Sequence, residues 1–279
     1  MTPHVKILIL NWNGKELLTP CLDSVLDIDY PNYSVKIIDN KSTDGSISMV
    51  HKNYPDVEIM ELDRNYGFAG GYNRCFTKIK EKPSEFIMLL NNDTLVDPMI
   101  LHSFNTAREQ YGDNHIYGGK IYYQSHPERI WYAGGKVNLK FGYVSHIGIR
   151  NIDGDEFSSL QNTDYITGCC LFTSTKVIKL LDGFDERFNF YGEDVDLCLR
   201  GKERDINCYY CPQVKLWHHI SASIGGEFAL SRLFKKEKNL LKLILNHLII
   251  FQIPFALICN ILLFIIELLY RLIIKNKTD

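Results

Sequence analysis

The sequence predicts an α/β protein built on a mostly parallel central sheet. Three observations support this prediction: short apolar strands alternate with helical patterns over the first hundred residues, polar side chains follow the strands where they end, and an acidic segment opens a helix late in the chain. Such alternation is typical of parallel sheets, because neighbouring parallel strands are usually joined by a crossover helix. These crossovers are expected to be right-handed.

The first hundred residues supply four strands and the helices between them. Val5–Leu10 is an apolar strand, and the apolar residues that follow between positions 17 and 26 are spaced as on one face of a helix. Capping residues introduce a short helix at Ser46–Asn53, and a Gly-rich segment at Asn65–Gly71 precedes a helix through Lys80. The remaining strands are predicted at Val35–Ile38, Val57–Leu62 and Phe86–Leu90.

From about Gly118 to Thr173 the pattern changes to aromatics, glycines and short alternating runs. This pattern predicts antiparallel strands and loops that wall one side of a crevice. A further buried strand is predicted at Thr167–Phe172, followed by a helix at Thr175–Leu181. The alternating runs are Lys120–Tyr123, Trp131–Gly135 and Gly142–Ile149.

Polar side chains gather where the predicted parallel strands end. Asn11 and Asn13 follow the first strand, Asp39 and Asn40 follow the second, and Asn91–Asp93 follows the fourth. In open α/β sheets the ligand binds outside the carboxyl ends of the strands. Three separate segments are therefore expected to meet at one binding crevice.

An acidic segment marks the start of a later helix. Glu193, Asp194 and Asp196 lie within four residues, and Glu193 and Asp194 fall at the helix N-terminus, where the helix dipole favours ionised carboxylates. An ionised carboxylate at the mouth of a cleft can act as a general base. The alternative is an acidic helix cap with a solvated face. Apolar residues that can face a core follow at Val195, Cys198 and Leu199.

The bulk composition is that of an ordinary globular protein. The 279 residues are 46% hydrophobic and 23% charged, with a net charge of −2. This balance argues against a disordered chain and gives no support for a nucleic-acid partner, which usually requires a basic excess. No signal-peptide pattern opens the sequence, so the eight cysteines are expected to stay reduced in a cytosolic setting.

The last forty residues are strongly apolar. Leu248–Ile266 is interrupted only by Gln252, Pro254 and Asn260, and lysines flank the stretch on both sides. Two helices lying on or dipping into a membrane surface, a single span, and helices packed in a soluble protein or a homodimer are the three alternatives. We expect a first domain at residues 1–230 and a membrane-associating helical segment at 231–279.

Taken together, residues 4–225 resemble family 2 glycosyltransferases, whose nucleotide-sugar-binding domain has the GT-A fold, a Rossmann-like arrangement. The subgroup they resemble most is the rhamnosyltransferase-like enzymes of bacterial surface-polysaccharide assembly. One departure is that only the last position of the metal-binding motif, Asp93, is a carboxylate. The matching segments are Val5–Gly14, Ile38–Ser46, Asn65–Asn73, Leu90–Thr94, Gly183–Glu186, Gly192–Arg200 and Trp217–Ser223.

The resemblance implies a role for each motif. Asp194 is the implied base, with Glu193 as the rival base or as a residue that orients the acceptor. Asp93 and His218 are the implied ligands of Mn²⁺ or Mg²⁺, and His219 competes with His218 for that role. Gly168 and Trp217 are implied in acceptor binding. The implied nucleotide-sugar-binding residues are Asn11, Asn13, Asp39, Asp44, Gly67, Gly71, Asn73, Asn92 and Asp93.

Structural interpretations of several of these residues stay open. Asp39 can instead form a turn through its own side chain, and Asp93 can cap the helix that follows Pro98. Asp196 and Arg200 are spaced to pair along one helix surface.

The expected activity is that of an inverting, metal-dependent glycosyltransferase at the cytoplasmic face of the cell membrane. The donor is expected to be dTDP-rhamnose, with a UDP-hexose or UDP-N-acetylhexosamine as the alternative, and the acceptor a hydroxyl of a glycan or lipid-linked glycan. A nucleotidyltransferase is disfavoured because Lys15 alone supplies positive charge after the first strand. An inactive, membrane-anchored carbohydrate-binding scaffold is the alternative from another class.

Overall fold

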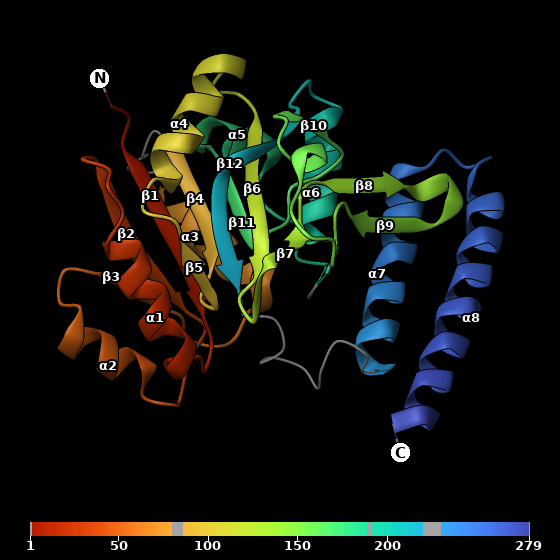
Figure 1. The fold of residues 1–279 in the computed structure, drawn as a ribbon, viewed down its shortest axis with the longest axis horizontal. Helices are drawn as coiled ribbons and strands as arrows, with labels where there is room; N and C mark the ends of the chain where they lie inside the picture. The colour runs from red at the N-terminus through yellow and green to blue at the C-terminus, as the bar shows by residue number, and fades with distance from the viewer. Residues whose placement is uncertain (1, 80–85, 189–190, 220–229, 279) are drawn as a thin grey trace.

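The computed structural model describes residues 2–79, 86–188, 191–219 and 230–278. Within these residues the main sheet has ten strands in the order β10-β12-β6-β11-β4-β1-β2-β3, with β5 paired to β12 and β7 paired to β6. Helices cover both faces, so the predicted α/β architecture is confirmed (Figure 1). The predicted end of the third helix, Lys80, lies outside the described residues.

The first half of the chain forms the parallel part of the sheet. All four predicted strands and the helices between them are present, and β1, β2, β3 and β4 run parallel. The elements are β1 (Val5–Asn11), α1 (Lys15–Leu26), β2 (Tyr33–Asp39), α2 (Ser46–Asn53), β3 (Glu58–Glu61), α3 (Gly67–Ile79) and β4 (Phe86–Asn91).

The strand order reverses between β1 and β4. From β1 the chain steps outward to β2 and β3, and it then returns to place β4 on the other side of β1. A right-handed crossover in the opposite direction puts α3 on the opposite face of the sheet from α1. The carboxyl ends of β1 and β4 therefore form a topological switch point, the place where α/β sheets bind ligands.

The Gly-rich segment lies inside a helix and does not precede it. α3 begins at Gly67, so Gly70 and Gly71 are helical. A Cβ atom on Gly71 would lie 2.5 Å from Cδ1 of Leu10, a residue of β1. The glycine is therefore needed for α3 to pack closely on the sheet, a reason that local sequence pattern does not reveal.

The second half of the chain adds the antiparallel strands that the sequence predicts. β11 runs antiparallel to β4 and β6, whereas β12 returns parallel to β6. The elements are β5 (Thr94–Val96), α4 (Ile100–Tyr111), β6 (Ile116–Tyr123), β7 (His126–Tyr132), β8 (Gly135–Asn138), η1 (Leu139–Phe141), β9 (Tyr143–His146), η2 (Asp155–Phe157), β10 (Gln161–Thr163), β11 (Cys170–Ser174), α5 (Thr175–Leu181), α6 (Glu193–Lys202) and β12 (Cys208–His218).

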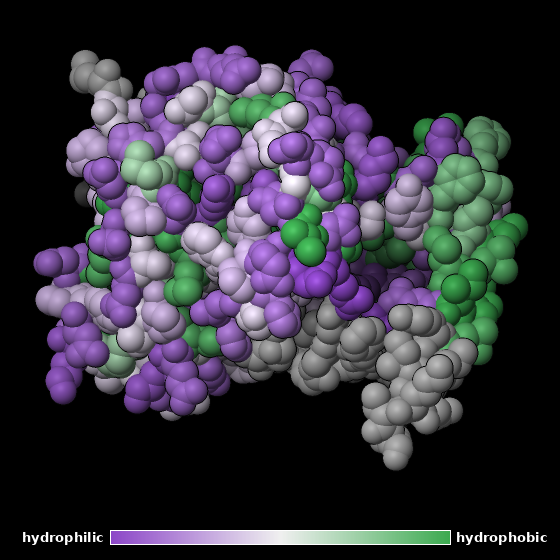
Figure 2. All heavy atoms as spheres, viewed as in Figure 1, coloured by the Kyte–Doolittle hydropathy of each residue, from purple (hydrophilic) through white to green (hydrophobic). Residues whose placement is uncertain are grey.

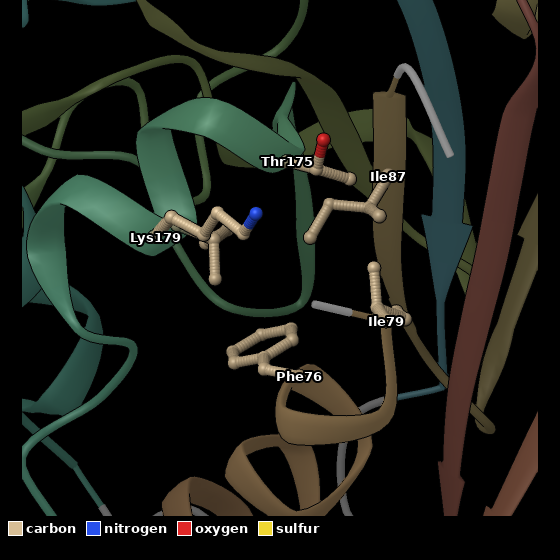
Figure 3. A pocket seen from close by; sticks show the side chains of 6 residues that line it. Phe76, Ile79, Ile87, Thr175 and Lys179 are labelled. Atoms are coloured by element: carbon tan, nitrogen blue, oxygen red, sulfur yellow. The ribbon is translucent and has the colours of Figure 1, made fainter. Parts of the chain in front are cut away.

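Two cavities lie away from the carboxyl ends of the parallel strands. Figure 3 shows an apolar recess between α3, β4 and α5, lined by Phe76, Ile87 and their neighbours. Its volume of about 10 Å³ is far below the several hundred Å³ that small-molecule sites need. A cavity of about 290 Å³ with a mixed lining lies beside the C-terminal half of α6, next to Lys136, Lys202 and Ile206.

The chain ends in a helical hairpin made of α7 (Leu230–His247) and α8 (Ile253–Thr278). The hairpin stands at one side of the molecule, next to the small β8–β9 sheet (Figure 1). The helices are separated at residues 248–252, and Pro254 lies in the first turn of α8, where its fixed φ suits a helix start. Figure 2 shows apolar residues covering much of the outer surface of α8. Among the described residues, we find no helix whose length and hydropathy would let it cross a membrane.

Candidate active site

Asn11 joins the ends of three parallel strands. Its side chain is fully buried, and Nδ2 lies 3.2 Å from Oδ1 of Asp39 and 3.0 Å from the Ser46 hydroxyl. Its Oδ1 accepts a hydrogen bond of 2.8 Å from Nδ2 of Asn92. The structure therefore brings three of the predicted nucleotide-sugar-binding residues together, and it uses Asn11 itself as their internal link.

Asp39 forms the turn that the sequence left open as an alternative. One carboxylate oxygen accepts from the Ser42 backbone N–H at 2.9 Å, and the other accepts from the Ser42 hydroxyl at 2.5 Å. Asp44 in the same loop accepts from the backbone N–H groups of Lys15 and Ser46. Asn13 accepts from the Thr43 backbone N–H at 2.7 Å. These contacts fix the loop after β2 against the start of α1.

Trp12 was missed by the sequence reasoning. It lies between Asn11 and Asn13 at the end of β1, and its indole is 57% exposed. Large exposed aromatic side chains next to polar strand ends are suited to stack on a nucleobase. The sequence signal that could have identified Trp12 is a tryptophan placed directly after a buried strand, among the polar residues at the strand end.

Helix α3 holds three more of the predicted nucleotide-sugar residues, Gly67, Gly71 and Asn73. Gly67 has φ +71° and its carbonyl accepts from Nδ2 of Asn40 at 2.9 Å. Asn73 clasps the backbone of Phe184, donating to its carbonyl at 2.8 Å and accepting from its N–H at 2.9 Å. Gly71 is buried against β1. The structure thus gives Gly71 a packing contact at the ends of β1 and β2, whereas Asn73 braces the backbone of Phe184.

Asp93 and His218 meet at the end of β4. Nε2 of His218 lies 3.1 Å from Oδ1 of Asp93, but the geometry does not form a hydrogen bond. Among the described residues this buried Oδ1 has no hydrogen-bond partner, and neither has Nδ1 of His218. His219 is exposed, and its backbone N–H donates to the Asp93 carbonyl at 2.8 Å. The structure therefore favours His218 over His219 as the partner of Asp93.

A carboxylate oxygen and an imidazole nitrogen are donors that suit Mn²⁺, and the orphaned Asp93 oxygen fits such an ion. The part of the chain that the structure describes holds no cluster of three His, Cys, Asp or Glu side chains arranged for a metal. An ion at Asp93 would therefore rely on water and ligand oxygens as well. The capping alternative for Asp93 is wrong, because β5 intervenes and Met99 is the residue that precedes α4.

Two aromatic rings beside His218 were not predicted. Trp131 meets the His218 ring edge-on at 4.6 Å and the His146 ring at 4.5 Å. Burial and the charge of Lys236 lower the pKa of His146 to about 3, so it is neutral. Trp217, predicted to bind the acceptor, precedes His218 on the same strand and so faces the other side of the sheet, where it stacks on Tyr122.

The candidate base lies at the first turn of α6. Oδ2 of Asp194 accepts from the Gly168 backbone N–H at 2.9 Å, and Oδ1 accepts from the Val195 backbone N–H at 2.8 Å. Glu193 is 6% exposed, and its Oε2 has no hydrogen-bond partner within the described chain. A Cβ on Gly168 would lie 2.7 Å from the Phe68 ring, so only glycine fits here.

The two carboxyl groups differ in how well they are stabilised. Burial and the neighbouring Asp194 charge raise the pKa of Glu193 to about 8. Burial also raises the pKa of Asp194, but the N–H groups of Gly168 and Val195 oppose this shift by stabilising its ionised form. The most stable state of the pair is therefore the one in which Glu193 is protonated and Asp194 is ionised.

One turn, Thr167–Cys169, contacts both Asp194 and the end of β4. Burial and then the negative charge of Asp93 raise the pKa of the Cys169 thiol, and the adjacent Gly168 N–H donates to Asp194. The Cys169 carbonyl also accepts from the Asn91 N–H at 3.0 Å, which ties the turn to the end of β4. The sequence predicts a strand at Thr167–Phe172, but β11 starts at Cys170, and Thr167–Cys169 forms the turn before it.

Protonation of Glu193 predicts a pH-dependent stability. The folded state keeps a proton on Glu193 between about pH 4.5 and 8, whereas the unfolded chain releases it, so the free energy of unfolding falls as pH rises through this window. The slope from one such group is at most about 1.4 kcal/mol per pH unit. Urea unfolding between pH 5 and 8 should show this fall in the wild type and a flatter profile in Glu193→Gln. Parallel profiles would contradict a protonated Glu193.

Comparison with known proteins agrees with this geometry. The family model described as "Glycosyltransferase like family 2" matches residues 3–236. The O-antigen biosynthesis protein RfbC of Myxococcus xanthus is 28% identical over 232 residues, which are 80% of this chain, and the chain spans only 18% of that protein's length. The N-acetylglucosaminyl-diphospho-decaprenol L-rhamnosyltransferase of Mycobacterium tuberculosis is 22% identical over 70% of this chain and 69% of its own.

The fold is shared with solved glycosyltransferases. The mannosyltransferase PcManGT of Pyrobaculum calidifontis, solved with GDP-Man and Mn²⁺, superposes with a TM-score of 0.62 at 15% sequence identity. The match covers 93% of this chain and 74% of that one. The GT-A fold expected from the sequence is therefore confirmed.

Proposed function

The chain belongs to glycosyltransferase family 2, and we propose that it transfers a sugar from a nucleoside diphosphate donor to an acceptor hydroxyl, with inversion at the anomeric carbon. One observation carries the proposal: the turn Thr167–Cys169 donates to Asp194 through the Gly168 N–H and accepts from the Asn91 N–H at the end of β4, where Asp93 approaches His218. That arrangement supplies one group for the departing diphosphate and one for the attacking hydroxyl.

The donor half of the crevice would hold the nucleotide. The nucleobase of the donor would stack on Trp12 and form hydrogen bonds near Asp39, where internal hydrogen bonds fix the loop after β2. Asp93 and His218 would hold Mn²⁺ or Mg²⁺ beside the diphosphate. When bound, such an ion neutralises the negative charge that develops on the leaving diphosphate.

The acceptor half would carry the proton transfer. Asp194 is positioned by the Gly168 N–H and takes the proton of the acceptor hydroxyl as that oxygen attacks the anomeric carbon. Glu193, being protonated, donates a hydrogen bond to the acceptor. One base and an in-line attack give inversion. Gly168, expected to contact the acceptor, would then act by orienting the base.

We propose dTDP-rhamnose as the donor and a lipid-linked glycan as the acceptor. The name of the Mycobacterium relative supports both choices, since it gives a rhamnosyltransferase and a diphospho-lipid acceptor. A UDP-hexose or UDP-N-acetylhexosamine is the alternative donor. The apolar surface of α8 supports an acceptor that is carried by a membrane lipid.

The full chain in detergent with Mn²⁺ tests the function directly. Release of free nucleoside diphosphate would be followed with dTDP-rhamnose, UDP-glucose, UDP-N-acetylglucosamine and GDP-mannose, with a lipid-linked N-acetylglucosamine as acceptor. We expect release from dTDP-rhamnose that EDTA abolishes. Release from another donor would contradict the choice of rhamnose but would support the proposed glycosyl transfer. No release and no donor binding by calorimetry would favour the inactive scaffold.

The apolar surface of α8 and of the loop before it, which we call the hairpin face, would dock on the cytoplasmic face of the membrane. Phe251 is 89% exposed and Ile250 is 73% exposed. Exposed lysines on the first half of α7 suit an anionic lipid surface. Further exposed members are Ile249, Phe255, Ile258, Ile261, Leu262, Ile265, Ile266 and Leu269.

Vesicle flotation tests this docking. The wild type should float with vesicles that contain anionic lipid, and Ile250→Ser with Phe251→Ser should lower the bound fraction several-fold, because apolar burial contributes about 25 cal/mol per Å². Leu180→Ser is the matched control, since Leu180 on α5 is also 53% exposed but lies outside the hairpin face. Equal flotation of all variants would contradict docking through this face. If the wild type sediments as a dimer and the double variant as a monomer, the hairpin face would instead be a site of self-association.

A further inference from the structure

The C-terminal hairpin contacts the helix that carries the candidate base. His247, the last residue of α7, places Nε2 2.8 Å from Oδ1 of Asp196. Asp196 is 2% exposed and lies two residues after Asp194. Because an ionised carboxylate can only accept, the His247 ring N–H donates. Nδ1 of the same ring lies 3.7 Å from Oε1 of Glu203, at the other end of α6.

Asp196 connects several elements. Its second oxygen accepts from Nε of Arg200 at 2.7 Å, and Arg200 donates on to the carbonyls of Leu181 and Gly183. The pairing of Asp196 with Arg200 was expected on a helix surface, but Asp196 is buried and Arg200 is only partly exposed. The residue after Gly183 is Phe184, and its backbone N–H and carbonyl are both hydrogen-bonded to the side chain of Asn73.

α7 also covers the segment that leads into α6. Nζ of Lys242 donates to the Arg187 carbonyl and lies 5.4 Å from the centre of the Phe188 ring. A Cβ on Gly192 would lie 3.6 Å from Asn239. Gly192 has φ +94° and Tyr191 has φ +75°, so the backbone enters α6 through two residues in the left-handed region. Such an entry persists only where the surroundings hold it.

We propose that His247 is a positioning residue for the transfer reaction, and that it fixes the first turn of α6 through Asp196. The inference rests on the proposed function, because it concerns the placement of Asp194 as base. α6 has only ten residues, so a shift at Asp196 moves the Asp194 carboxylate with it. A displacement of about 1 Å at a reacting group can cost about a hundredfold in rate. The hairpin would thus complete the active site as well as dock the protein.

Steady-state kinetics of His247→Ala tests the proposal. We expect kcat to fall at least about tenfold while the donor dissociation constant from calorimetry stays within about twofold, because the donor half of the crevice is untouched. His247→Gln should recover most of kcat, since its amide N–H can still donate to Asp196. Asn246→Ala, an exposed neighbour on the same turn, is the matched control.

Each outcome separates the inference from the function on which it rests. Unchanged kcat in His247→Ala, with transfer by the wild type intact, would overturn the positioning role alone. A fall in melting temperature with unchanged kcat per folded molecule would reduce His247 to a stabilising contact. Absence of transfer by the wild type would overturn the proposed function and this role together.

Discussion

Asp194→Asn is expected to lower kcat by about a thousandfold and to leave donor binding within about twofold, since a general base contributes about a hundredfold to ten-thousandfold. The substitution removes the ability to take a proton. It keeps the shape of the side chain, and the asparagine Oδ1 can still accept from the Gly168 N–H that now holds the carboxylate at 2.9 Å. The fold and the donor half of the crevice should therefore be preserved.

Transfer kinetics with calorimetry of the donor measure this effect. Asp205→Asn is the matched control, because Asp205 is an exposed carboxylate after the end of α6 and its left-handed backbone suits asparagine. Glu193→Gln separates the two carboxyl groups. It should lower kcat far less, because a protonated glutamic acid and a glutamine both donate a hydrogen bond. A larger loss in Glu193→Gln than in Asp194→Asn would reverse the assignment of the base.

The parallel half of the fold could be predicted because its signals are local. Ser46–Asn53 and Thr175–Leu181 are helices with the predicted bounds, since Asp44 and Ser174, just before them in sequence, accept from backbone N–H groups of their first turns. The convergence of Asn11, Asp39 and Asn92 also followed from sequence, because strand ends in a parallel sheet must share one edge.

The partners of these side chains could not be predicted, because they depend on contacts between distant segments. Asp39 and Asp44 were predicted to bind the nucleotide sugar. In the structure, both carboxylates accept hydrogen bonds from backbone N–H groups of the surrounding loops. Trp131 reaches His218 across a separation of 87 positions, through a pairing of β6, β7 and β12 that no local pattern encodes. No local pattern singles out His247, because its contact with Asp196 joins two helices that lie 51 positions apart in the sequence.

Asp93→Ala is the second substitution with a large expected effect, on donor binding as well as on rate. Asp93 offers a buried oxygen that has no hydrogen-bond partner among the described residues, 3.1 Å from His218, at the place where the diphosphate would lie. Removing it should weaken binding of a nucleoside diphosphate in Mn²⁺ at least about tenfold and lower kcat about a hundredfold. The reason is that the contact of the protein with the metal ion and the contact of the ion with the diphosphate would be lost together.

Calorimetry of nucleoside diphosphate binding, in Mn²⁺ and again in EDTA, separates the metal contribution from that of the protein. In the wild type EDTA should weaken binding to about the level of Asp93→Ala, and the variant should respond little to EDTA. His218→Gln should behave like Asp93→Ala, whereas His219→Gln should behave like the wild type, because the His219 side chain is exposed and only its backbone meets Asp93. Binding that ignores EDTA in the wild type would mean that the charge of the diphosphate is neutralised by protein groups. The approach of Asp93 to His218 would then be a structural contact, and a metal-free reaction would replace the one proposed.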